Sequence, residues 1–298
     1  MKRLLPLLCS LCLLFTGCAA SDASGQEDDT LYIVATTYPV YLFTTAITEG
    51  VEGVEVTRLI TESISCLHDY TLTVNDMKAI EKADVLIMNG AGLEDFLSDA
   101  LAQTGAFVID CSENIDLLAA QGHEGHDHDT EYDPHIWMTK EGAAAMMTAI
   151  LQGLSERDAD NAQLYADNCD SAIDLLSTIP DETAPLLCPY FITFHDGFQY
   201  FSDAFGLTLL KSIEEEEGSE ASAAEIKEIV ALIEEYDIPA IFTEKNGSDA
   251  TAQAISRETG AAVYQLDMIM SGDGSGIGPY IDAMNANLDT IVQALGGN

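Results

Sequence analysis

The chain has 298 residues, of which 51 are acidic and 11 are basic, so its formal net charge is −40. This excess of negative charge excludes nucleic acid as a partner, because phosphate groups would be repelled. The charge can raise the local concentration of cations, but an acidic proteome or a salty habitat would produce it as well. The length is sufficient for two lobes with a large core.

The N-terminal residues have the pattern of an export signal. Basic residues precede an apolar run that ends at Phe15, and small residues lead to Cys18. The run is too short for an ordinary transmembrane helix. Because the segment resembles the lipobox of bacterial lipoproteins, we interpret 1–17 as a lipoprotein signal peptide and Cys18 as the lipidated residue, with plain secretion as the alternative. Residues 18–30 are predicted to form a flexible tether.

Strands and helices alternate along the rest of the chain. The predicted strands are 31–36, 54–60, 84–88, 106–109, 190–194, 207–212, 240–243 and 262–266. The predicted helices are 39–49, 73–82, 92–102, 139–155, 160–179, 196–205, 222–236, 248–259 and 279–295. Helical crossovers imply parallel sheets, so we predict an α/β protein. Its N-terminal βα lobe covers 31–137, a linking helical segment covers 138–180, and a C-terminal βα lobe covers 181–298.

Four side chains lie at the carboxyl ends of predicted strands or in the connection between the lobes, where α/β sheets bind ligands. They are His68, His135, His195 and Asp267. A neutral imidazole is a common metal ligand, although a single histidine is more often a structural residue. Together the four residues predict one metal site. Glu244, which follows the neighbouring strand, is the alternative to Asp267.

Six segments occur in the order seen in the zinc- and manganese-binding lipoproteins of bacterial ABC importers (cluster A-I type), which the chain therefore resembles. They are Thr36-Thr-Tyr-Pro-Val40, His68-Asp-Tyr70, Ala83-Asp84 with Asn89-Gly-Ala-Gly-Leu-Glu94, Asp133-Pro-His-Ile-Trp137, Phe194-His-Asp-Gly-Phe198 and Leu266-Asp267. The resemblance implies two βα lobes with parallel sheets joined by a long rigid α-helix, with the metal site in the cleft between the lobes. It also implies that His68, His135, His195 and Asp267 are the metal ligands.

The resemblance also implies a metal and a function. Family members that favour manganese tend to have a carboxylate at the third ligand position, where this chain has His195. Nitrogen ligands suit zinc, so Zn²⁺ is the expected ion and Mn²⁺ the alternative. We expect the protein to be an extracytoplasmic monomer, lipid-anchored to the bacterial cell membrane. It would capture the ion with high affinity and deliver it to a membrane permease driven by a cytoplasmic ATPase.

Two other classes of function remain as alternatives. A metal-dependent surface adhesin with structural zinc fits the lipid anchor and the acidity. A zinc hydrolase needs an open coordination position and a general base, and a fourth ligand at Asp267 would close the site. The sequence contains neither an HExxH motif nor a Gly-x-Ser-x-Gly elbow, so we expect that the protein is not an enzyme.

Cysteines give a further prediction near the expected site. Cys66 lies two residues before His68, where its thiolate could ligate zinc. An exported thiol is more often oxidised, and Cys66 and Cys111 both follow predicted strands of the first lobe. We therefore favour a disulfide between them, with fully reduced cysteines as the alternative.

Two loops complete the set of candidate sites. The first, which carries His123, His126 and His128, resembles the His-rich loops of zinc-binding family members and is either an auxiliary metal trap or a solvated polar loop. The second, Gly272-Asp-Gly-Ser-Gly-Ile-Gly278, lacks the Lys-Ser/Thr ending of a phosphate-binding loop. We expect it to be a mobile loop beside Asp267.

Overall fold

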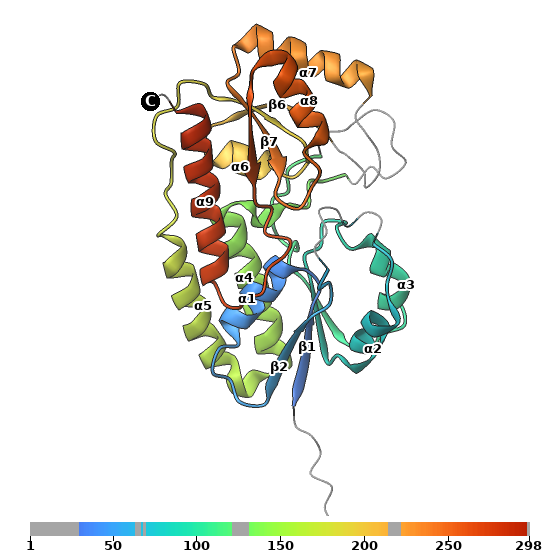
Figure 1. The fold of residues 1–298 in the computed structure, drawn as a ribbon. Helices are drawn as coiled ribbons and strands as arrows, with labels where there is room; N and C mark the ends of the chain where they lie inside the picture. Colours follow the sequence, from blue (N-terminus) through green and yellow to red (C-terminus); the bar gives the residue numbers. More distant parts are fainter. Residues whose placement is uncertain (1–29, 63–66, 68–69, 121–130, 214–221, 297–298) are drawn as a thin grey trace, which may run out of the picture.

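Two α/β lobes make up the computed structural model, which describes residues 30–62, 67, 70–120, 131–213 and 222–296 (Figure 1). The first sheet has the strand order β2-β1-β3-β4 and the second β6-β5-β7-β8. Every strand pair in both sheets is parallel. The predicted fold class, two βα lobes with parallel sheets, is therefore confirmed.

The first lobe and the helices that follow it run from β1 to α5. These elements are β1 (Leu31–Ala35), α1 (Tyr38–Ile47), β2 (Val54–Arg58), α2 (Val74–Lys82), β3 (Val85–Met88), η1 (Asp95–Leu97), α3 (Ser98–Leu101), β4 (Phe107–Asp110), η2 (Ile136–Met138), α4 (Lys140–Arg157), η3 (Ala159–Asn161) and α5 (Ala162–Leu176). The prediction of a single helix over 92–102 is wrong: the structure has only η1 and the short helix α3 in this segment. Ala91 has a left-handed backbone with φ 54°, and the Glu94 carboxylate turns inward to accept hydrogen bonds from the backbone N–H groups of Asn89 and Gly90.

The second lobe repeats the alternation of strand and helix. Its elements are β5 (Tyr190–Thr193), α6 (Gln199–Ala204), β6 (Thr208–Ser212), α7 (Ala223–Tyr236), β7 (Ala240–Glu244), α8 (Ala250–Thr259), β8 (Ala262–Leu266) and α9 (Gly278–Leu295). Capping boxes begin α2, with Thr73 and Asp76, and α7, with Ser222 and Glu225, as the sequence predicts.

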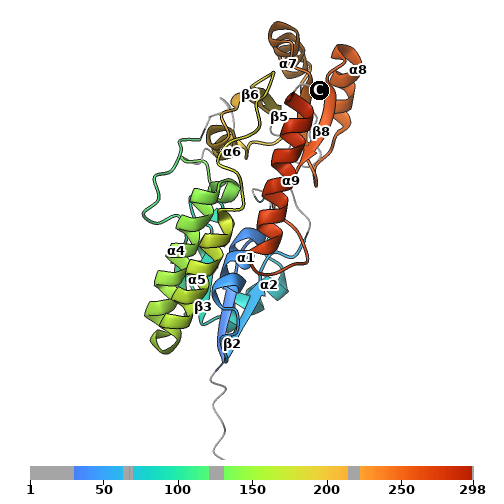
Figure 2. The same cartoon turned by 90° about the vertical axis from the view of Figure 1, so that its left-hand side faces the viewer.

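The segment between the lobes contains the two predicted helices, α4 and α5, which pack against each other and against α1 (Figures 1 and 2). α5 ends at Leu176, and non-helical residues 177–189 continue to β5. The resemblance implied one long helix between the lobes. In the structure, α9 contacts both lobes, at α1 in the first and at β8 in the second.

The central strands β3 and β7 show why the sheets form. β3 is an uninterrupted apolar run, and all five residues of β7 are buried. Strands that are covered by helices on both faces have continuous apolar sequences of this kind, instead of alternating polar and apolar residues. β3 leads into Asn89 and β7 ends at Glu244, so the two cores place both polar side chains where the lobes meet.

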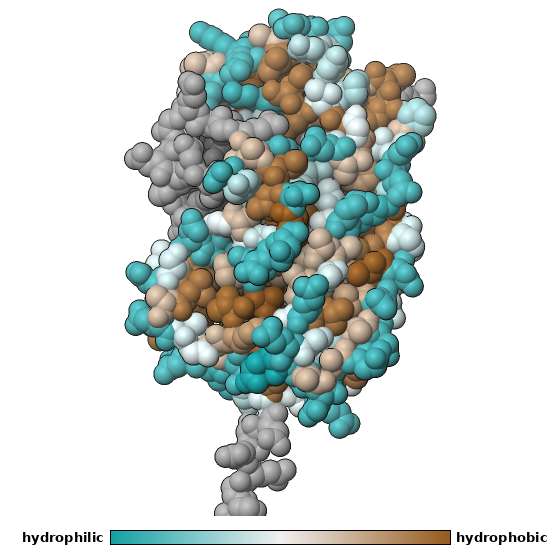
Figure 3. All heavy atoms as spheres, turned by 180° about the vertical axis from the view of Figure 1, so that it is seen from behind, coloured by the Kyte–Doolittle hydropathy of each residue, from teal (hydrophilic) through white to brown (hydrophobic). Residues whose placement is uncertain are grey.

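Polar residues cover much of the outer surface. The face opposite to that of Figure 1 shows hydrophilic side chains over both lobes, with apolar patches between them (Figure 3). Among the residues that the structure describes, no helix combines the length and apolar character needed to span a bilayer.

Candidate metal site

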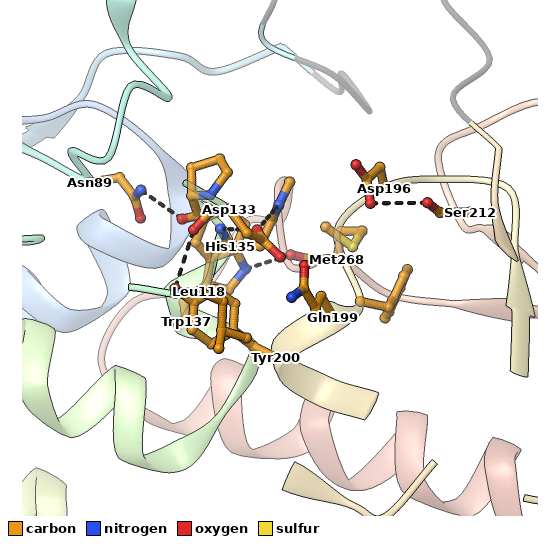
Figure 4. Close-up of polar contacts among 12 residues, drawn as sticks. Asn89, Leu118, Asp133, His135, Trp137, Asp196, Gln199, Tyr200, Ser212 and Met268 are labelled. Atoms are coloured by element: carbon orange, nitrogen blue, oxygen red, sulfur yellow. Dashed lines mark hydrogen bonds and ion pairs between the residues drawn. The ribbon is translucent and has the colours of Figure 1, made fainter. Parts of the chain in front are cut away.

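The connection that leaves the first lobe fixes the backbone around His135. The side-chain amide of Asn89, at the end of β3, donates to the backbone oxygen of Pro134 over 2.9 Å (Figure 4). The backbone N–H of Asp133 donates to the Leu118 oxygen over 2.9 Å, and the Tyr200 hydroxyl of the second lobe donates to the Asp133 oxygen over 3.2 Å. Both lobes therefore hold this short segment.

The Asp133 carboxylate sets the tautomer of His135. Asp133 Oδ1 lies 2.8 Å from His135 Nδ1 and 2.9 Å from the backbone nitrogen of the same residue. Because a carboxylate can only accept, Nδ1 carries the proton and Nε2 keeps its lone pair for a ligand. His135 is 7% exposed, and its ring packs beside Trp137, with 5.2 Å between the ring centroids.

The second lobe contributes His195 at the carboxyl end of β5. Its ring is nearly perpendicular to that of His135, with centroids 5.7 Å apart and an interplanar angle of 87°. The backbone N–H of His195 donates to the Thr193 hydroxyl over 3.2 Å, and the next residue, Asp196, accepts from Ser212 over 3.1 Å (Figure 4). These contacts hold the loop that faces His135.

Gly197 allows the close approach of the two lobes at this point. A Cβ atom on Gly197 would lie 3.0 Å from His135 Nε2 and 2.2 Å from the Met268 terminal methyl. The absence of a side chain therefore leaves space beside His135 Nε2.

Glu244 is buried next to His195. It is 2% exposed, and its Oε2 lies 3.6 Å from His195 Nδ1. Neither carboxylate oxygen has a hydrogen-bond partner within the described part of the chain. Burial, followed by the nearby charge of Asp267, raises the pKa of Glu244 to about 8.

Asp267 occupies the carboxyl end of β8, and both of its oxygens have partners. Oδ1 accepts from the backbone N–H of Ile269 over 2.7 Å, and Oδ2 accepts from Lys245 Nζ over 3.1 Å. The Asn287 side chain on α9 bonds both the N–H and the C=O of Asp267. Ile269 has φ 62°, an unusual backbone conformation for a β-branched residue, so the turn after Asp267 is strained.

The segment 272–276, which we call the interlobe strap, connects the Asp267 turn to the first lobe. Its three hydrogen bonds are Arg58 Nη1 to Gly272 O (2.9 Å), Gly274 N to Tyr38 Oη (3.1 Å) and Gly276 N to Thr45 Oγ1 (2.8 Å). A Cβ on Gly272 would lie 2.5 Å from Tyr38 Oη, so the glycine permits the contact. The sequence predicted a mobile loop here, whereas these bonds dock it on α1 and β2.

The predicted site residues thus have different outcomes. The structure brings His135, His195 and Glu244 together, while Asp267 is bonded to Lys245. Among the described residues, no three potential ligands converge closely enough to hold an ion. Several predicted residues lie outside the described part of the chain, namely Cys18, Cys66, His68, His123, His126 and His128.

Cys111 carries a free thiol, and Cys66, its predicted disulfide partner, lies outside the described residues. The Cys111 side chain is fully buried, and burial raises the pKa of the thiol, which disfavours the thiolate needed for exchange.

Sequence reasoning missed three residues that shape the site: Asp133, Gly197 and Lys245. The first had a usable signal, because a carboxylate two residues before a candidate ligand can orient its ring. The roles of the other two depend on contacts between segments far apart in the sequence.

Comparison with known proteins identifies the family to which the chain belongs. The family model described as "ZnuA: Zinc-uptake complex component A periplasmic" matches residues 33–294. The chain belongs to this family. Among curated ZnuA-family relatives, the manganese-binding lipoprotein MntA of Halalkalibacterium halodurans is 26% identical over 302 residues, covering 96% of this chain and 95% of the relative. The high-affinity zinc uptake system protein ZnuA of Bacillus subtilis is 28% identical over 309 residues, covering 95% and 94%.

Solved structures of the family share the fold. The solute-binding protein FpvC of Pseudomonas aeruginosa, in complex with Mn²⁺, superposes with a TM-score of 0.76 at 27% identity, covering 89% of this chain and 98% of FpvC. A crystal structure of ZnuA gives a TM-score of 0.76 at 26% identity, covering 90% and 100%.

Proposed function

We propose that the protein is an extracytoplasmic solute-binding lipoprotein that captures Zn²⁺ with high affinity for delivery to an ABC importer. The observation that carries this proposal is the pair of imidazole rings, one beside each lobe, that face each other 5.7 Å apart. A pair of this kind could bind one ion between the lobes. The ion is cargo in this proposal, so the protein needs no hydrolytic activity.

The proposed ligands are His68, His135, His195 and Asp267. His135 is the best prepared of them, because Asp133 already directs its Nε2 toward the site. Asp267 would have to exchange Lys245 for the ion at Oδ2. Three nitrogen ligands and one oxygen ligand form a closed set that suits four-coordinate zinc and leaves no open position for water activation.

Manganese is the second candidate ion. A manganese-binding relative at 26% identity favours it, as does the Mn²⁺ complex of FpvC at 27%. The zinc uptake relative at 28% identity and the nitrogen donor of His195 favour zinc. Borderline-soft imidazoles prefer Zn²⁺ over Mn²⁺, so we expect zinc to displace manganese in a competition titration.

The proposal is tested with the purified mature protein and zinc alone. We expect one zinc ion per chain and no zinc-dependent hydrolysis of ester or phosphate substrates. His195→Ala should weaken zinc binding strongly while leaving the far-UV and near-UV circular dichroism unchanged. Gln199→Ala is the matched control, because Gln199 begins α6 close to the site but is not a proposed ligand. Zinc affinity of His195→Ala equal to that of the wild type would refute the assignment.

Delivery and location need a cellular test. We propose that Cys18 carries the lipid anchor and that a membrane permease with a cytoplasmic ATPase receives the ion. In the source bacterium, deletion of the gene should slow growth in zinc-depleted medium. The wild-type gene should restore growth, whereas the His195→Ala gene should not. Cys18→Ser should release the protein from the membrane fraction, and retention there would contradict the anchor.

A further inference from the structure

We propose that Glu244 is a positioning residue for His195: its carboxylate accepts the Nδ1 proton of His195 and so directs Nε2 to the metal. This inference deepens the proposed function, because it takes His195 as a ligand. It gives the second lobe its own carboxylate–histidine pair. The two lobes would then present two oriented imidazoles to one ion.

The pair in the first lobe shows what such an arrangement looks like. Asp133 Oδ1 lies 2.8 Å from Nδ1 of His135, which is a hydrogen bond. Glu244 Oε2 approaches the same ring atom of His195 at 3.6 Å, just beyond hydrogen-bond length. The planes of the His135 and His195 rings are nearly perpendicular, with an interplanar angle of 87°. A small rotation of the His195 ring would close the second bond and make the two pairs equivalent.

The burial of Glu244 indicates that its carboxylate has a purpose other than folding. The residue ends the fully buried strand β7, and neither oxygen has a hydrogen-bond partner in the described ranges. A buried carboxyl group without hydrogen-bond partners costs several kcal/mol relative to an apolar side chain of similar shape. The fold alone would favour an apolar residue here. His195 Nδ1 is a polar atom that lies near Oε2, at 3.6 Å.

Geometry distinguishes this role from direct metal binding by Glu244. The Nδ1–H bond and the Nε2 lone pair point away from each other, out of two different edges of the imidazole ring. Since the Glu244 carboxylate faces Nδ1, an ion on Nε2 would lie across the ring from it. Glu244 can therefore orient His195 but cannot share its ion at Nε2. A zinc ion on Nδ1, bound jointly by Glu244, is the competing arrangement.

The test compares wild type, Glu244→Gln and Glu244→Ala, with zinc alone as the probe. Loss of such a carboxylate partner typically weakens metal affinity by about 10-fold to 100-fold. We expect Glu244→Ala to show this loss and Glu244→Gln, which keeps an acceptor oxygen, to fall between it and the wild type. Unfolding of metal-free Glu244→Gln should require about as much urea as that of the wild type, because the substitution keeps the size of the side chain and removes no hydrogen bond within the described residues.

Two spectra separate positioning from other roles. In zinc-loaded protein labelled with ¹⁵N-histidine, the His195 Hδ1 proton should be visible and shifted downfield. It should be lost or moved upfield in Glu244→Ala, while the His135 Hδ1 proton stays unchanged. In the Co²⁺-loaded protein, the d–d bands of Glu244→Gln should keep the wild-type positions, because no ligand is replaced.

Three results would overturn the proposal. Wild-type zinc affinity in Glu244→Ala, or an unchanged His195 Hδ1 resonance, would show that Glu244 does not position the ring. Shifted Co²⁺ bands in Glu244→Gln would make Glu244 a ligand. If the wild-type protein itself bound no zinc, the proposed function would fail instead, which keeps the two failures distinct.

Discussion

Removal of the Lys245 side chain should tighten zinc binding. Lys245 Nζ lies 3.1 Å from Asp267 Oδ2, an atom that the proposed site needs for the metal. At that distance the pair interacts by about 1.3 kcal/mol in water. The Lys245 side chain is 64% exposed, so the net contribution falls to about 0.2–1 kcal/mol. Lys245→Met should therefore lower the zinc dissociation constant by about 1.4-fold to 5-fold.

The assay is a competition titration against a chromophoric chelator at low and high ionic strength. Salt screens the ammonium group, so the difference between the variant and the wild type should shrink at high salt. Lys211→Met is the matched control, because Lys211 pairs with Glu228 on α7 rather than with a proposed ligand. An unchanged or weaker zinc affinity in Lys245→Met, with the control also unchanged, would refute competition between Lys245 and the ion for Asp267.

Three further predictions concern Gly197, Asp133 and Glu94. Gly197→Ala adds a methyl group 3.0 Å from His135 Nε2 and should weaken zinc binding by about tenfold. Gly247→Ala is the control, because its Cβ would make only ordinary van der Waals contacts. Equal zinc affinities of Gly197→Ala and the wild type would contradict the reasoning. Asp133→Ala removes the acceptor that faces Nδ1 and should weaken zinc binding by about 10-fold to 100-fold, whereas a change below threefold would show that the carboxylate does not set the tautomer. Burial raises the pKa of Glu94 from 4.5 to about 7. The stability that the protonated Glu94 carboxyl provides is therefore fully present below pH 4.5. It is lost as the pH rises from 4.5 to about 7, and the free energy of unfolding falls by about 3 kcal/mol at most. Urea unfolding of Glu94→Gln should lack this part of the pH dependence, and identical pH slopes would contradict the assignment.

Strand and helix alternation was readable from the sequence because each element has its own period. Apolar runs such as Val85–Met88 predicted the central strands, and Thr73 and Ser222 marked two helix starts correctly. The segment 92–102 failed because its helical pattern competes with the inward-facing carboxylate of Glu94. Local periodicity does not reveal a side chain that bonds the loop before it.

The site was only partly predictable. The sequence placed His195 at the carboxyl end of a strand and His135 in the connection between the lobes, where α/β proteins bind ligands, and the structure brings the two rings together. The pairing of Asp267 with Lys245 was not predictable, because two adjacent strand ends present both residues and only the side-chain conformations decide the contact. The docked strap was missed for a related reason: glycines signal backbone freedom, and here that freedom permits contact with Tyr38.

The interlobe strap has a consequence for how the molecule comes apart. Together with the bonds from Trp137 Nε1 to the Met268 oxygen and from the Tyr280 hydroxyl to the Trp137 and Thr139 oxygens, it ties the segment after β8 to the other half of the chain. Neither half can unfold without exposing these buried polar groups. The protein should therefore melt as one cooperative unit, with a calorimetric enthalpy equal to the van't Hoff value, rather than as two independent domains.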